Sequence, residues 1–187
     1  MEVREAIQKY KRYTYEDYCT WGDDERRELI DGVPYAMAAP SWRHQEISGQ
    51  LNRLIGNYLV GKPCKVLAAP FDVRLIEDAY GDTVVQPDIS VICDQSKLDD
   101  KGSIGAPDMV IEILSPSTAM LDKLLKFKKY LQSGVREYWI VDPDSNTVAV
   151  HILKNGEYVT YAYGSDETIP VYVLEGCVID LKEVFTY

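Results

Sequence analysis

Several patterns that mark common protein classes are missing from this 187-residue sequence. Its four cysteines are scattered, with neither Cys-x-x-Cys nor Cys/His spacing, so structural zinc is not expected. No apolar run approaches the roughly 20 residues that a membrane-spanning helix needs, and the charged first segment has no apolar stretch of signal-peptide type. We therefore expect a protein of a reducing cytoplasm, in which Cys64 and Cys93 are small core residues.

An excess of basic residues is also missing. The chain has 20 Lys and Arg against 30 Asp and Glu, a formal net charge of −10. Because phosphate neutralisation needs clustered cations, this balance argues against a large surface that binds nucleic acid nonspecifically. It is compatible with a local basic cleft. The length and the apolar content of 46% fit one globular domain over residues 1–187, with residues 1–13 as a loose arm.

The apolar periodicity predicts an α+β fold with a mixed central sheet, flanking helices and C-terminal β-hairpins. One helix is expected from Ser41 to Gly61, because apolar residues recur there at helical spacing, and a second over about 119–132 before Gly134. A short helix should follow Thr14, and residues 94–107 should form a loop. Strands or hairpins are expected at 27–37, 64–76, 84–93, 108–114, 136–142, 147–153, 157–163 and 170–176.

Two of these strands carry an acid where strands are usually uncharged. Asp88 opens the strand after Pro87, and Glu112 lies between Ile111 and Ile113. A carboxylate buried in a strand is costly unless it is paired or binds a metal. Asp88 also fits a turn residue at the strand entry, and Glu112 also fits a structural ion pair.

The order of several short segments resembles the PD-(D/E)XK nuclease superfamily, and more narrowly its Uma2 group of restriction-endonuclease-like proteins, which is abundant in cyanobacteria. The resemblance implies a restriction-endonuclease-like mixed sheet flanked by helices. The segments that carry it are ELIDGVPYAM at 28–37, His44-Gln45, PFDVRL at 70–75, QPDISVI at 86–92, APDMVIEILSPST at 106–118, the four-residue series Asp122, Lys126 and Tyr130, and GVREYWIVDP at 134–143.

This resemblance also implies roles for four residues. Asp88 and Glu112 match the two acids that bind Mg²⁺, for which Mn²⁺ is a plausible substitute. The usual lysine of the superfamily would fall at Leu114, which cannot act, so the resemblance points to Lys126 in the following helix. Glu28 matches an acid of the first strand that completes the metal shell, through water or directly.

The choice of lysine is less clear from the helical pattern alone. At 100° per residue, Asp122, Lys126 and Tyr130 form one ridge, on which Asp122 is expected to pair with Lys126. Lys128 falls on the apolar face, so it is an alternative to Lys126 as the lysine that points into the site. The resemblance favours Lys126. The apolar face consists of Met120, Leu121, Leu124, Phe127 and Leu131.

Other polar residues have structural interpretations that compete with functional ones. Glu28 fits a surface ion pair with Arg26 or Arg27 as well as a site acid. Asp72 is expected to be structural, and His44 fits a helix cap, a phosphate contact or no role. Tyr130 is expected to pack, while Lys123, Lys126, Lys128 and Lys129 form either a solvated face or a local basic patch.

Together these features predict a Mg²⁺-dependent endonuclease that hydrolyses phosphodiester bonds, with double-stranded DNA as the expected partner. A bound Mg²⁺ lowers the pKa of its water and neutralises phosphate charge, and a nearby lysine orients or deprotonates the water. The later hairpins suggest a homodimer. The main alternative is a non-catalytic nucleic-acid-binding or interaction module on the same fold, because Leu114 replaces the usual lysine and the net charge is negative. A second alternative is a metal-dependent enzyme that acts on RNA or a nucleotide.

Overall fold

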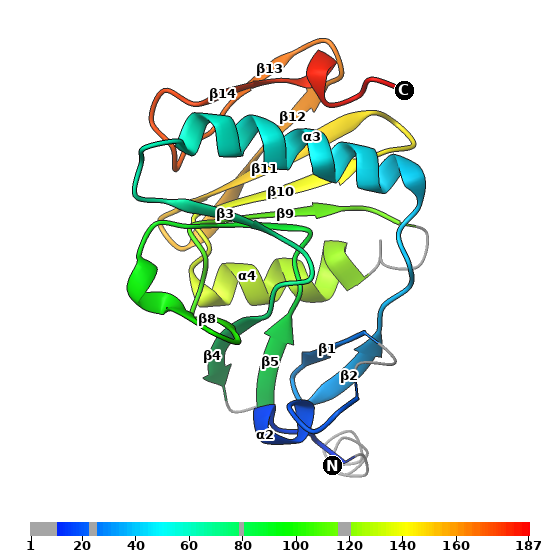
Figure 1. Ribbon diagram of the computed structural model, residues 1–187, viewed down its shortest axis with the longest axis vertical. Helices are drawn as coiled ribbons and strands as arrows, with labels where there is room; N and C mark the ends of the chain where they lie inside the picture. Colours follow the sequence, from blue (N-terminus) through cyan, green and yellow to red (C-terminus); the bar gives the residue numbers. More distant parts are fainter. Residues whose placement is uncertain (1–10, 23–25, 79–80, 116–120) are drawn as a thin grey trace.

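The computed structural model describes residues 11–22, 26–78, 81–115 and 121–187, and its strands form three sheets (Figure 1). The N-terminal sheet has the order β2-β1-β5-β4-β8-β7. These strands are β1 (Arg27–Ile30), β2 (Val33–Ala36), β4 (Val73–Asp78), β5 (Gly81–Val85), β7 (Leu98–Asp99) and β8 (Gly102–Ile104). The sheet begins as the expected hairpin, whose turn residues Asp31 and Gly32 have φ of 53° and 71°, as a two-residue β-hairpin turn requires.

The C-terminal sheet has the order β12-β11-β10-β9-β6-β3, with β9 and β10 parallel. Its strands are β3 (Lys65–Ala68), β6 (Ile89–Ile92), β9 (Met109–Ile113), β10 (Glu137–Asp142), β11 (Thr147–Lys154) and β12 (Glu157–Gly164). A small third sheet pairs β13 (Thr168–Pro170) with β14 (Val178–Asp180). The helical segments are α2 (Tyr15–Tyr18), η1 (Gln95–Lys97), α3 (Trp42–Leu59), η2 (Leu121–Lys126), α4 (Phe127–Ser133) and η3 (Leu181–Glu183).

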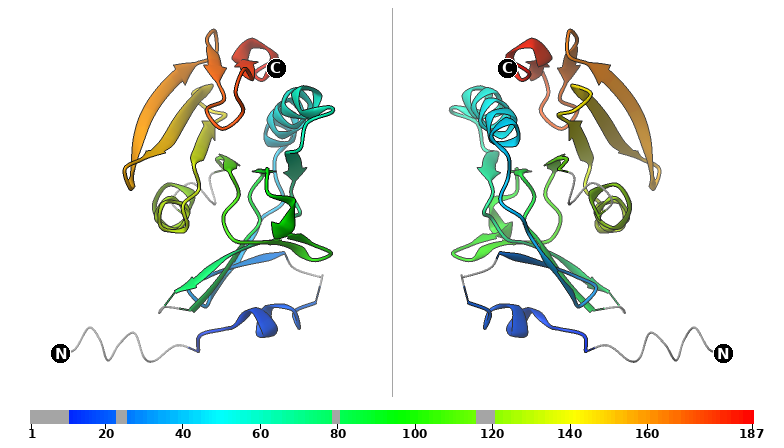
Figure 2. Two further views of the ribbon diagram at one scale, coloured as in Figure 1. Left: turned by 90° about the vertical axis from the view of Figure 1, so that its left-hand side faces the viewer. Right: turned by 90° about the vertical axis from the view of Figure 1, so that its right-hand side faces the viewer.

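The long helix α3 and the helix α4 cover opposite faces of the C-terminal sheet (Figures 1 and 2). The α3 face holds Ile111 of β9, and the α4 face holds Val110 of the same strand, because side chains alternate along a strand. As expected for a central strand, β9 is buried on both faces. Glu112 shares the parity of Val110 and therefore faces α4. The predicted α3 is confirmed, with Ser41 as its N-cap and Ile47, Leu51, Ile55 and Leu59 buried.

Two of the segments by which the chain crosses between the two large sheets are short and contain proline. Residues 69–72, around Pro70, lead from β3 in the C-terminal sheet to β4 in the N-terminal sheet. Residues 86–88, around Pro87, lead back from β5 to β6. Proline interrupts strand pairing because it lacks an N–H donor. Asp88 therefore lies at the junction of the two sheets.

The second helix differs from a continuous α-helix. Its described part begins with the π-helical η2, continues as α4 and ends at Gly134, whose φ is 82°. A π-helix is closed by hydrogen bonds between residues i and i+5, so it is wider than an α-helix. Lys126 and Tyr130 are both buried, whereas Lys128 and the apolar Leu124 are exposed. The helix therefore buries the ridge of Lys126 and Tyr130 in place of part of the apolar face that the pattern predicted.

Three expectations for the fold need correction. A single central sheet was expected, but the chain passes repeatedly between two six-stranded sheets, the second of which consists of β1, β2, β4, β5, β7 and β8. The segment 94–107 contains η1, β7 and β8 as well as loop. The expected strand at 170–176 is wrong, because β13 ends at Pro170 and only turns follow. Of the expected loose arm, residues 1–10 lie outside the described part, and Tyr13 N–H donates to the carbonyl of Gly32 at 2.9 Å.

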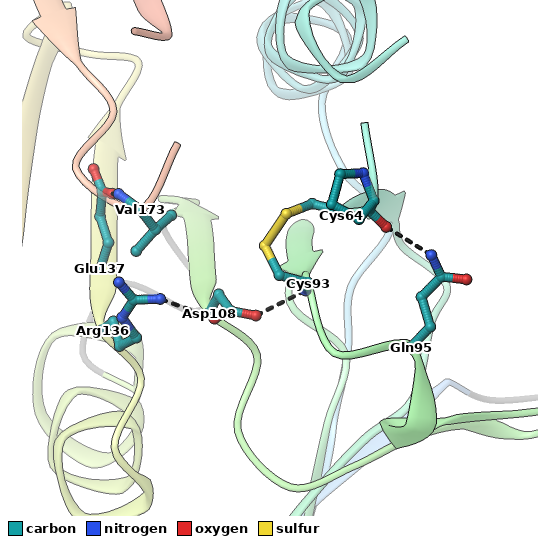
Figure 3. Close-up of a disulfide and its surroundings, with 8 residues drawn as sticks. Cys64, Cys93, Gln95, Asp108, Arg136, Glu137 and Val173 are labelled. Carbon is teal, nitrogen blue, oxygen red and sulfur yellow. Dashed lines mark hydrogen bonds and ion pairs between the residues drawn. A yellow bond between two sulfur atoms is a disulfide. The ribbon is translucent and has the colours of Figure 1, made fainter. Parts of the chain in front are cut away.

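The expectation for Cys64 and Cys93 also needs correction, since the two residues form a disulfide (Figure 3). Strands β3 and β6 pair antiparallel with Lys65 opposite Ile92. Cys64, which precedes Lys65, therefore lies opposite Cys93, which follows Ile92. The two Cα atoms lie 3.9 Å apart. This bond joins the edge strand β3 to the strand that follows Asp88.

Among the described residues, no helix has both the length and the apolar character needed to cross a bilayer.

Candidate active site

Glu112 is buried among polar partners on the α4 face of the C-terminal sheet. The residue is only 3% exposed, and its Oε1 lies 3.0 Å from Nζ of Lys126. The hydroxyl of Tyr130, one turn further along the helix, donates to the same oxygen at 2.6 Å. The phenol and the ammonium group together fix the position of this carboxylate, whose charge would otherwise be costly to bury.

Lys126 connects the acids of the two large sheets. Its Nζ also lies 2.8 Å from Oε1 of Glu28, which is 1% exposed and comes from β1. The same Glu28 oxygen accepts the backbone N–H of Gln86 at 2.8 Å. Lys126 itself is 2% exposed, so one buried cation lies between two buried carboxylates. Such an arrangement costs desolvation energy and is weak evidence for stability alone.

Asp88 is held at the sheet junction by two contacts. Its Oδ2 accepts the backbone N–H of Ile113 at 2.7 Å, which places Asp88 beside the strand position next to Glu112. Nε2 of His44, in the first turn of α3, lies 3.2 Å from the same oxygen. This partner of His44 was not predicted, because the contact joins α3 to a residue 44 positions later in the chain.

A small cavity of about 80 Å³ opens over these groups, and we call it the acidic cleft. Asp88 and Glu112 both line it, together with the buried Lys126. Glu28 is not among its lining residues, so it lies behind Lys126 rather than in the cleft. The remaining lining residues are Arg26, Met37, Ala38, Ala39, Pro40, His44, Gln45, Ser48, Ala69, Ile113 and Ser115.

The phenol of Tyr130 is constrained to act as a donor. Its complete burial raises its pKa well above the usual value, and the negative charges of Glu112 and Glu28 raise it further. The hydroxyl therefore keeps its proton over the whole range of ordinary assay pH. Tyr130 was expected only to pack, and its place on the same ridge as Lys126 was the available signal for a polar role.

Comparison with known proteins identifies the family. The profile of the Uma2 family, described as "Putative restriction endonuclease", matches residues 12–182. The chain belongs to the Uma2 family. The resemblance drawn from the ordered sequence segments is thereby confirmed.

Relatives of this Uma2 chain occur in cyanobacteria. "Uncharacterized protein slr1290" of Synechocystis sp. is 27% identical over 164 residues, which cover 86% of this chain and 85% of the relative. "Uncharacterized protein sll1609" of the same organism is 28% identical over 121 residues, covering 63% of this chain and 67% of the relative. A crystal structure of a "putative nuclease belonging to DUF820" from Anabaena variabilis matches with a TM-score of 0.76 at 22% identity, covering 92% of this chain and 97% of that one. This structural match shows a shared fold.

Other candidate residues of the Uma2 chain lie at varied distances from the cleft. Lys128 is exposed, and the side chain of Asp122 lies outside the part of the chain that the structure describes. Asp72 accepts from Tyr18 and from the Gln86 side chain, as its expected structural role requires. The four lysines expected to form a solvated face or a local basic patch are divided, because Lys126 is buried and Lys129 is buried against Asp31.

The donor set in the acidic cleft fits a magnesium ion. Mg²⁺ prefers oxygen ligands and keeps several waters, so one or two carboxylates suffice to hold it. Asp88 and Glu112 provide two carboxylates in one cavity. Within the described ranges, no group of three or more His, Cys, Asp and Glu side chains is assembled for a metal, so further ligands would be waters or backbone oxygens such as that of Ile113.

Proposed function

We propose that this Uma2 protein is a Mg²⁺-dependent endonuclease that hydrolyses phosphodiester bonds of DNA in the acidic cleft. The observation that carries the proposal is the meeting of Asp88, Glu112 and Lys126 in one cavity, with the lysine amine 3.0 Å from Glu112. An arrangement with no amine near the acids would have favoured a non-catalytic module. In the acidic cleft these groups come from the segment that precedes β6, from β9 and from η2, which supports a metal-dependent hydrolase.

Asp88 and Glu112 are the residues that would hold the ion. When bound there, Mg²⁺ supplies charge neutralisation at the phosphate and lowers the pKa of an attacking water. The backbone N–H of Ile113 and the imidazole of His44 orient Asp88. Tyr130 orients Glu112 in the same way, through its donated hydrogen bond.

We assign Lys126 two roles. Its ammonium group offsets the carboxylate charges of Glu28 and Glu112, between which it lies. It also lines the cleft, where a positive charge orients a nucleophilic water or stabilises negative charge on the phosphate. Glu28 is a positioning residue here, because it contacts Lys126 and the Gln86 backbone without lining the cleft.

A plasmid-nicking assay tests the proposal. Supercoiled DNA is incubated with Mg²⁺ and wild-type protein, or with Asp88→Asn, Glu112→Gln or the control Asp166→Asn, whose side chain is exposed beyond β12. We expect nicking that chelation abolishes, a loss of at least about 100-fold in the two cleft variants, and the wild-type rate in the control. Equal rates in wild type and cleft variants would reveal a contaminating nuclease and overturn the proposal.

A further inference from the structure

A second cavity, of about 530 Å³, adjoins the acidic cleft, and we call it the aromatic cavity. Arg26 lines both spaces, and the consecutive residues Ala69 and Pro70 line the cleft and the cavity respectively. Its volume lies within the range of sites that bind small organic ligands, about 300–1,000 Å³. The lining residues are Tyr15, Tyr18, Cys19, Trp21, Gly22, Arg26, Arg27, Pro70, Asp72, Gln86 and Lys101.

Aromatic rings and cations meet in the lining of this cavity. The rings of Tyr18 and Trp21 lie 5.3 Å apart between centroids in an edge-on arrangement. The guanidinium of Arg27 lies 5.6 Å from the Trp21 ring, at cation–π distance. Among the described residues of the lining, Arg26, Arg27 and Lys101 are cationic and Asp72 is anionic.

A network of hydrogen bonds holds the polar side of the cavity in place. Oδ1 of Asp72 accepts from the Tyr18 hydroxyl at 2.9 Å and from Nε2 of Gln86 at 2.8 Å. The Gln86 side-chain oxygen accepts from Nη2 of Arg26 at 2.7 Å. Burial and the Asp72 charge raise the pKa of Tyr18, so its hydroxyl remains a donor. These fixed groups can form hydrogen bonds with the edge of a base.

The same network reaches the acidic cleft. The backbone N–H of Gln86 donates to Glu28, which contacts the Lys126 amine. One residue thus contacts the aromatic cavity with its side chain and supports the cleft with its backbone. A ligand in the cavity would lie beside the proposed site of phosphodiester cleavage.

We infer that the aromatic cavity binds one unpaired nucleotide of the strand whose phosphodiester lies in the acidic cleft. The inference rests on the proposed function and narrows its substrate to nucleic acid with an unpaired stretch. Stacking on aromatic rings is tolerant of base identity, and cations beside the rings bind the backbone, which is how single strands are held. A base within an intact duplex would have to leave its stack to enter.

The first test is binding without metal. Fluorescence anisotropy with chelator present compares a labelled 12-nucleotide single strand and its duplex. The proteins are wild type, Trp21→Ala, Trp21→Phe and the control Tyr172→Ala, which removes an exposed aromatic of the C-terminal segment. We expect tighter binding of the single strand, about 5- to 150-fold weaker binding for Trp21→Ala, a smaller loss for Trp21→Phe and none for the control. Equal affinities in wild type and Trp21→Ala would overturn the inference.

A charge substitution away from Trp21 and an abasic scan provide two further tests. Lys101→Gln changes an exposed side chain and should reduce the slope of log affinity against log salt by about 0.7 for a single strand. An unchanged slope would count against the cavity. In a second test, an abasic site is moved along the single strand. At one position it should weaken binding to the wild-type protein. At that position it should weaken binding to Trp21→Ala much less, because the base and Trp21 would be coupled partners. A free mononucleotide that binds as tightly as the strand would overturn the assignment to a strand.

Binding and cleavage fail independently. Glu112→Gln should lose nicking but keep Trp21-dependent binding of the single strand. If wild type binds in this way but cleaves no nucleic acid, the inference stands and the proposed function falls. If wild type cleaves through Asp88 and Glu112 while Trp21→Ala binds normally, the proposed function stands and the inference falls.

Discussion

The amine of Lys126 lies 3.0 Å from Glu112, although 14 residues separate the two along the chain. In the superfamily that this chain resembles, the lysine lies two residues after the second acid. Here that position is Leu114, which is 8% exposed and packs in the core beside α4. The chain thus brings a lysine to the acid from the helix that follows the strand.

Lys126→Met should be both destabilising and inactivating. It leaves Glu28 and Glu112 buried without their cation, a change that costs about 3–5 kcal/mol of unfolding free energy. The matched control is Lys128→Met, whose exposed side chain should change stability by no more than about 0.5 kcal/mol. Urea denaturation and the nicking assay measure the two effects. Similar behaviour of the two variants would contradict the placement of Lys126.

Tyr130→Phe should lower the unfolding free energy by about 1.5–3 kcal/mol, because it removes a hydrogen bond to a buried carboxylate. Nicking should slow as Glu112 loses one of the groups that orient it, but less than in Glu112→Gln. The exposed Tyr161→Phe is the control. A Tyr130→Phe protein with wild-type stability and wild-type nicking would argue against this role.

Acid should destabilise the protein through His151. Burial lowers its pKa from 6.5 to about 4, while Phe127, Tyr138 and Tyr158 surround the ring. Between these values the unfolded chain binds the proton and the folded protein does not, so stability falls as pH decreases from 6.5 towards 4. His151→Phe lacks this proton uptake. Thermal melts at several pH values should show wild type losing more stability than the variant over this interval; parallel curves would refute the prediction.

The disulfide makes stability depend on redox conditions. Cys64 and Cys93 are separated by 29 residues, and closing a loop of that size stabilises by about 3–4 kcal/mol in the chain-entropy description. A reductant should therefore lower the denaturation midpoint of wild type. The double variant Cys64→Ala/Cys93→Ala should show the lower midpoint with and without reductant, and a wild-type midpoint insensitive to reductant would show that the bond does not contribute.

Glu112 and Asp88 were accessible to sequence reasoning because their signals are local. An acid inside an apolar strand stands out in the sequence, and the structure shows that Glu112 lies on the same side of the sheet as Val110. Asp88 follows a proline that interrupts strand pairing, so its place at a sheet end followed from the same short segment. The hairpin at Asp31-Gly32 and the helix after Ser41 were equally local, and both are found.

The burial of Lys126 could not be derived from the helical pattern. The pattern placed Lys126 and Tyr130 on one ridge, as found, but it predicted that the apolar face would be buried, and Leu124 of that face is exposed. Only the family resemblance favoured Lys126. Which face of a helix is buried depends on the strands that pack against it, and those contacts join distant parts of the sequence.

Contacts between distant segments were also beyond sequence reasoning. The pairing of His44 with Asp88 depends on how α3 crosses the sheet, and the disulfide depends on the register of β3 against β6. A second six-stranded sheet was missed for a similar reason. Hydrophobic alternation identifies a strand, but it does not say which neighbour the strand will choose.

A crystal of the protein soaked in Mn²⁺ and measured at an anomalous wavelength tests the central claim most directly. We expect a manganese peak in the acidic cleft, roughly 2.1 Å from carboxylate oxygens of both Asp88 and Glu112, with the Lys126 amine beside it. The peak should disappear in Glu112→Gln. A saturating soak that leaves the cleft without a peak, or a peak that survives the loss of Glu112, would contradict a metal site formed by these two acids.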